Sequence, residues 1–170
     1  RAKAVQAEEA ARRAGAGDAA LLAKVNAVPG CEKLNWNDIQ IASTIFAVKP
    51  GDGSAREQAA SCQRVLGAGA NIVTEYATKR YRSNLINWGM LPFIVDADLA
   101  NVLQVGDWLA VPHVRKAVQE AEPTLLAHIV RDGGKRRQRP QPLLRYHAYE
   151  QAHHDIRKHA ACGAVYQRGR

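Results

Sequence analysis

Cysteine is scarce in this chain. Only three cysteines, Cys31, Cys62 and Cys162, occur among 170 residues, and no two of them form a Cys-x-x-Cys pair. Their odd number and wide spacing argue against a disulfide framework and a cysteine-based metal motif, and are typical of a reducing compartment. Cys62 falls inside an expected helix, on a face that we expect to be buried, and we interpret it as a structural residue rather than a metal ligand.

Long apolar runs are absent as well. No stretch approaches the roughly 20 apolar residues that a membrane helix needs, whereas a hydrophobic content of 46% in 170 residues can bury one core. We therefore predict a globular protein with no membrane association, located in the cytoplasm or the mitochondrial matrix. The chain begins at Arg1, without a methionine and with an Arg- and Ala-rich stretch, so we expect a fragment or a processed product.

Acidic residues are outnumbered by basic residues, and the excess of positive charge is concentrated in one segment. Residues 131–170 hold ten Lys or Arg against three Asp or Glu. The basic cluster at residues 135–139 would attract phosphate or carboxylate groups, which suggests contact with RNA or an acidic protein. No aromatic stacking platform accompanies the cluster, so we favour a solvated basic loop.

Four of the six histidines also lie in this basic tail, for which we expect a loop followed by a helix over residues 146–162. Together with Asp155 and Cys162 they could be drawn as a metal site, but their spacing matches no standard ligand pattern. We interpret them as part of a solvated or partly packed helix. These histidines are His147, His153, His154 and His159.

Helical and strand-like segments alternate through the rest of the chain. Helices are expected at residues 2–13, 18–27, 54–66 and 78–88, and strands at 39–48, 71–76, 91–95, 107–111 and 124–130. One or two further helical turns are expected within 96–103. This order predicts an α/β fold with a mixed sheet. We divide the chain into a helical N-terminal segment (1–30), a central domain (31–130) and the basic tail (131–170).

The segment from Gly51 to Arg56 attracts attention because it follows a predicted strand and opens a predicted helix. Its glycines permit a close approach to the backbone, and a helix N-terminus attracts anions. Ser54 could then lie beside a bound carboxylate and, if its alkoxide were stabilised by N–H groups and a cation such as Arg56, remove a proton. The alternative is a plain turn in which Ser54 caps the helix.

This segment resembles the active-site stretch of the swivel domain in the aconitase superfamily. The family motif Gly-Ser-Ser-Arg-Glu-His corresponds to residues 53–58, GSAREQ, with Ala55 in place of the second serine and Gln58 in place of the histidine. The family's later Asn-Leu, Gly and Leu-Pro correspond to Asn84-Leu85, Gly89 and Leu91-Pro92. The variant motif is most similar to the aconitase family hydratases, and the resemblance spans roughly residues 31–130.

The resemblance implies a three-layer β/β/α swivel domain of a hydro-lyase, a lyase that removes water from or adds it to a hydroxy di- or tricarboxylic acid. It implies that Ser54 is the catalytic base. It also implies that a [4Fe-4S] cluster is bound by other domains or a large subunit rather than by this chain. The substrate-binding residues that it suggests, for an anionic carboxylate substrate, are Gly53, Ala55, Arg56, Arg80, Arg82 and Asn84. A second hypothesis is a catalytically silent aconitase-like subunit with a structural or RNA-associated role, which the basic tail and Ala55 favour.

Overall fold

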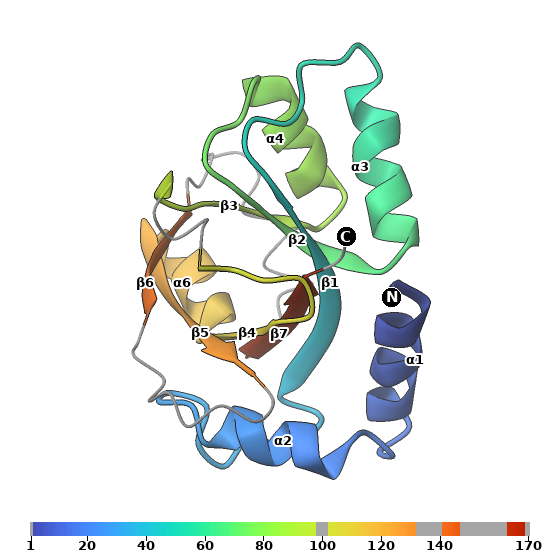
Figure 1. Ribbon diagram of the computed structural model, residues 1–170, viewed down its shortest axis with the longest axis vertical. Coiled ribbons are helices and arrows are strands. Elements are labelled where there is room, and N and C mark those ends of the chain that lie inside the picture. Colours follow the sequence, from blue (N-terminus) through green and yellow to red (C-terminus); the bar gives the residue numbers. More distant parts are fainter. Residues whose placement is uncertain (1, 98–101, 132–140, 147–162, 169–170) are drawn as a thin grey trace.

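The computed structural model describes residues 2–97, 102–131, 141–146 and 163–168 of the chain. Within these residues the strands close into a barrel in the order β1-β2-β3-β6-β5-β4-β7 (Figure 1). The strands are β1 (Ile39–Ala47), β2 (Ala68–Val73), β3 (Leu91–Ile94), β4 (Trp108–Pro112), β5 (Thr124–Val130), β6 (Gln141–Tyr146) and β7 (Gly163–Arg168). The helices are α1 (Ala2–Arg13), α2 (Ala19–Asn26), α3 (Arg56–Val65), α4 (Lys79–Asn87) and α6 (Val114–Glu120).

One half of the barrel is parallel and the other is antiparallel. Strand β1 pairs in parallel with both β2 and β7, and β2 pairs in parallel with β3. The remaining contacts, β3 with β6, β6 with β5, β5 with β4 and β4 with β7, are antiparallel. The predicted α/β fold with a mixed sheet is therefore confirmed. Helices α3 and α4 lie together on the outside of the parallel half (Figure 1).

Strand β2 is buried along its whole length, as expected for a central parallel strand covered on both faces. The interior of the barrel is an apolar cluster that includes Ile72 of β2, Phe93 of β3 and Leu109 of β4. Helix α6 contributes Val114 and Val118 to the same cluster. A separate small cluster, with Leu85 and Met90, packs α3 and α4 onto the sheet.

The N-terminal helices are present at the predicted places, and Asp18 accepts a hydrogen bond from the Ala20 N–H as the cap of α2. They share a third apolar cluster with the barrel, in which Val5 and Leu21 lie with Ile39 and Val130. The described part of the N-terminal segment, residues 2–30, therefore packs against the sheet through this cluster. No helix among the described residues has the length and apolar character required to cross a bilayer.

The structure differs from the sequence-based expectation in four elements. Strands β6 and β7 occur within the basic tail, where we expected a loop and a helix, and α6 was not foreseen. Strand β2 begins at residue 68 rather than 71, because Gly67, with φ of +84°, makes the turn from α3. The helix expected at 146–162, its histidines and the basic cluster at 135–139 lie outside the described residues, as do residues 98–101 of the helical turns expected at 96–103.

Candidate functional site

The segment between β1 and α3 forms the wall of an open hollow of about 480 Å³. Gly51 adopts a φ of +97°, a left-handed conformation that glycine tolerates best. A Cβ placed on Gly51 would lie 2.5 Å from the Cβ of Tyr81, so the tyrosine packs directly against the glycine backbone. The residues that line the hollow are Pro50, Gly51, Asp52, Gly53, Ser54, Ala55, Arg56, Ala59 and Tyr81.

Ser54 is exposed on this wall, one residue before the cap of α3. Ala55 is the capping residue and offers no side-chain hydrogen bond, so the alternative reading of Ser54 as the helix cap is wrong. The Ser54 hydroxyl makes no hydrogen bond to the rest of the described chain. The first N–H groups of a helix have no partner within the helix, and those of α3 begin beside this hydroxyl.

Arg56 is the first residue of α3 and folds back over the loop. Its Nε donates a hydrogen bond of 2.7 Å to the carbonyl oxygen of Gly53. In the described part of the chain no carboxylate forms an ion pair with Arg56, so its terminal nitrogens remain available for an anion. A guanidinium presents parallel N–H donors that suit a carboxylate, and here it lies at the positive end of a helix.

The predicted residues on α4 lie apart from those on the loop. Arg80 is exposed, whereas Arg82 and Asn84 are half-buried, and none of these three lines the hollow. Arg82 lies close enough to Tyr76 to lower the pKa of that phenol, although burial and the neighbouring Tyr81 outweigh it and raise the pKa well above the usual value. The structure thus places Gly53, Ser54, Ala55 and Arg56 around one hollow, and the three α4 residues outside it. The roles of all seven residues stay predictions.

Two residues of this region were not identified from the sequence. Thr78 caps α4, accepting a hydrogen bond from the Tyr81 N–H, and its Oγ1 donates to the carbonyl oxygen of Gly51 at 2.9 Å. Tyr81 is 3% exposed and lies under the loop. Two local sequence features could have indicated them. Thr78 directly precedes a helical run, as a capping residue does, and Tyr81 lies four residues before Leu85, on the same helix face.

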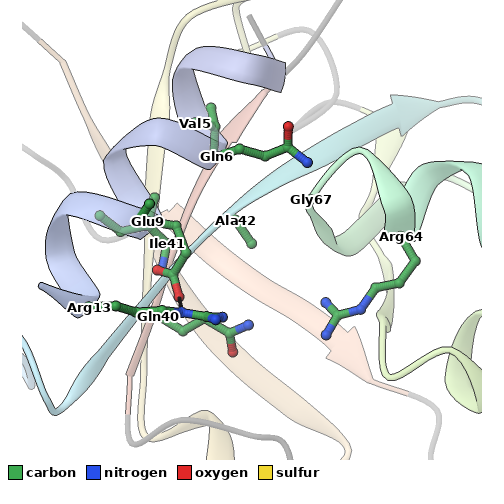
Figure 2. Close-up of a pocket in the computed structure, with 10 residues that line it drawn as sticks. Val5, Gln6, Glu9, Arg13, Gln40, Ile41, Ala42, Arg64 and Gly67 are labelled. Carbon is green, nitrogen blue, oxygen red and sulfur yellow. Dashed lines mark hydrogen bonds and ion pairs between the residues drawn. The ribbon is translucent and has the colours of Figure 1, made fainter.

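A second hollow, of about 330 Å³, lies between α1, β1 and the far end of α3 (Figure 2). Glu9 of α1 stands beside Ile41 of β1, and Arg64 of α3 reaches in from the other side (Figure 2). The Glu9 carboxylate accepts hydrogen bonds from Arg12, Arg13 and the Ile41 N–H, at 2.7–2.9 Å. The carboxylate already has its partners, so we assign this hollow to the docking of α1.

The described residues give no metal site. No group of three or more His, Cys, Asp or Glu side chains among them is placed to hold an ion. Cys31 is 2% exposed, and burial, reinforced by the charge of Glu32, raises the pKa of its thiol to about 11, so the thiol stays protonated at neutral pH. Cys62 is exposed on α3, so the expected burial of this residue is wrong; Ala60 is the buried residue of that helix.

The comparison with protein families agrees with the motif. Residues 27–98 match the aconitase C-terminal domain, and this span contains β1, the loop with Ser54, α3, β2, α4 and β3. No curated protein matches the chain. The resemblance to an aconitase swivel domain is thereby confirmed for the segment that carries the candidate site.

Proposed function

We propose that this chain is the swivel domain or small subunit of an aconitase-like hydro-lyase, because residues 27–98 match the aconitase C-terminal domain. Its substrate would be a hydroxy di- or tricarboxylic acid. The observation that supports this most directly is the gathering of Gly53, Ser54, Ala55 and Arg56 in one open hollow at the N-terminus of α3.

In this proposal Ser54 removes a proton from the carbon next to a substrate carboxylate. A serine hydroxyl is a weak base, so its alkoxide must be stabilised by hydrogen-bond donors already in place. The unpaired N–H groups of the first turn of α3 and the guanidinium of Arg56 are such donors, and both lie beside Ser54. The same groups bind the carboxylate whose neighbouring carbon loses the proton.

The hollow is open, and one wall alone cannot exclude water from a reaction. A partner that carries the other catalytic groups would close over it, as domain closure does in many enzymes. We propose that this partner is the cluster-bearing part of a longer chain or a large subunit, and that the [4Fe-4S] cluster belongs to it. Arg80, Arg82 and Asn84 on α4 are then candidates for contacts with substrate in the closed state.

The first test is the composition of the native particle. We expect the chain to purify within a longer polypeptide or with a tight partner, and the particle to carry iron in an amount of about four per site. An iron-free particle would contradict the proposal and favour a catalytically silent structural subunit.

The second test is Ser54→Ala in that particle, assayed for hydration of unsaturated di- and tricarboxylic acids. Loss of a catalytic base lowers turnover by about 10²–10⁴-fold, and we expect this loss with unchanged thermal unfolding. Ser61→Ala is the matched control, since that hydroxyl lies on α3, just beyond Ser54, and among the described residues bonds only to the Gln58 carbonyl oxygen. Equal turnover in the two variants would remove Ser54 from the mechanism.

A further inference from the structure

Tyr81 touches both flanks of the loop that carries Ser54. On one flank its side chain packs on Gly51. A Cβ added to this glycine would lie only 2.5 Å from the tyrosine side chain, so there is no room for one. On the other flank its hydroxyl accepts a hydrogen bond of 2.7 Å from Nε2 of Gln63, which belongs to α3. A third contact, of 3.1 Å from Nδ2 of Asn71, ties the same hydroxyl to β2.

These contacts lie in a buried polar cluster beneath the loop. Asn71 is fully buried and Tyr81 nearly so. Among the described residues, the buried atoms Gln63 Oε1, Asn71 Oδ1 and the Tyr76 hydroxyl have no hydrogen-bond partner. Buried polar atoms are costly unless they are paired. The Tyr81 hydroxyl is therefore the group on which both amides depend, and its loss would leave two buried donors unpaired.

The loop is also held at its base, and near α3 by the hydrogen bond from Arg56 to the Gly53 carbonyl oxygen. The Ala77 N–H donates to the Pro50 carbonyl oxygen at 3.0 Å, and Thr78 holds Gly51. Beyond Gly51 the loop is exposed as far as Ala55, where α3 begins with a bond from the Ala59 N–H to the Ala55 carbonyl oxygen. The position of Ser54 thus depends on how far Gly51 stands from the start of α3.

We propose that Tyr81 is a positioning residue that sets this distance and so places the Ser54 hydroxyl. The proposal rests on the function proposed above, in which Ser54 acts on a substrate. Tyr81 need not touch the reacting atoms. It fixes the Gly51 end of the loop by packing, and it fixes the α3 end through Gln63. A displacement of a catalytic group by about 1 Å can reduce turnover by about 10²-fold.

The variant Tyr81→Phe keeps the ring on Gly51 and removes the hydroxyl. In the native particle we expect kcat to fall by about 10-fold with KM changed by less than about twofold, because the substrate contacts remain while the base is misplaced. Tyr76→Phe is the matched control. It removes a neighbouring buried hydroxyl that bonds to no other described residue, so kcat should not change.

Amide hydrogen exchange on the chain itself supplies a readout that does not depend on activity. The Ala77 and Ala59 amides flank the loop, and the Val95 amide, which bonds to the Val73 carbonyl oxygen, is the reference. In Tyr81→Phe we expect the two flanking amides to exchange about 10-fold faster relative to this reference. Equal acceleration at all three amides would show general destabilisation and overturn the proposal. If the particle proves to have no hydro-lyase activity, the proposed function fails, whereas the exchange data still decide whether Tyr81 holds the loop.

Discussion

Gly51 and Gly53 illustrate, at the scale of single residues, how differently two glycines of one loop can be used. Gly51 has a left-handed φ and lies against Tyr81, whereas Gly53 has no atom within 4 Å of a position for Cβ and no positive φ. Only Gly51 therefore requires glycine for the fold. The absence of a side chain on Gly53 leaves the hollow beside Ser54 open.

Gly51→Ala should lower the free energy of unfolding by about 2–4 kcal/mol, because it adds backbone strain to a clash with a buried ring. Gly53→Ala should change it by less than about 0.5 kcal/mol, as is usual for exposed positions. Denaturant unfolding of the two variants gives both values. A similar decrease in the free energy of unfolding for both variants would show that the loop is not packed on Tyr81 as described.

The sequence was informative about this candidate site where a short motif marks it. Ser54 and Arg56 were identified from their place between a strand and a helix, and the structure places both beside one hollow. Tyr81 and Thr78 were missed because their importance arises from contacts with Gly51, Gln63 and Asn71. Such contacts join three elements and leave no pattern in any one of them.

Helix α1 shows how a polar side chain can add to the apolar packing that attaches an element to the sheet. Glu9 is 14% exposed, and it joins Arg12 and Arg13 of its own helix to the backbone of β1. Burial acts to raise the pKa of Glu9, but the hydrogen bonds from Arg12, Ile41 and Arg13 outweigh it and lower the pKa below 4.5. The charged form of Glu9 is therefore the one that holds α1 on the sheet.

Glu9→Gln should lower the free energy of unfolding at pH 7 by about 1–3 kcal/mol, the range for a hydrogen bond to a charged group. Because the folded pKa is depressed, the contribution is fully present above the unfolded value of 4.5 and is lost as pH falls through the folded pKa. The difference in the free energy of unfolding between wild type and Glu9→Gln should therefore decrease as the pH falls into the acid range.

Denaturant unfolding between pH 7 and the acid range measures this difference. The control is Glu120→Gln, whose carboxylate is 53% exposed and 3.9 Å from Lys116, and which should have little effect at any pH. A difference between Glu9→Gln and wild type that stays constant into acid would rule out a charged Glu9 as the attachment of α1.

Most elements were predictable because each carries its own periodicity. Apolar residues recur at regular spacing in β1, in β5 and in helices α1 to α4. Helices α2 and α4 also have capping side chains. Helix α6 is short and is preceded by His113 with a φ of +56° and no side-chain cap, so it has no sequence signal for its start. Strands β6 and β7 lie in a basic tail, and only their distant partners make them strands.

The closed barrel depends on β7 at the scale of the whole molecule. Residues 163–168 pair with β1 on one side and with β4 on the other. Without β7, both neighbours would have exposed edges, and β1 leads directly into the loop with Ser54. Unpaired strand edges promote aggregation. The parts of the basic tail that the structure describes, residues 141–146 and 163–168, are therefore strands of the barrel.

Ending the chain after residue 162 should abolish the cooperative thermal unfolding transition and increase light scattering, because the barrel opens between β1 and β4. A chain ending at residue 168 keeps β7 and is the matched control. Calorimetry and scattering on both would test the role of β7. A cooperative transition near the wild-type temperature in the shorter chain would contradict it.

Pairing between β1 and β7 also has a consequence during protein synthesis. Residues 39–44 leave the ribosome long before residues 163–168, with which they pair. The nascent chain must therefore keep one edge of β1 unpaired until almost all of this sequence has been translated, and contacts between such distant residues form slowly. The segment that bears Ser54 would acquire its final support only near the end of translation, which makes this protein a natural candidate for protection by chaperones.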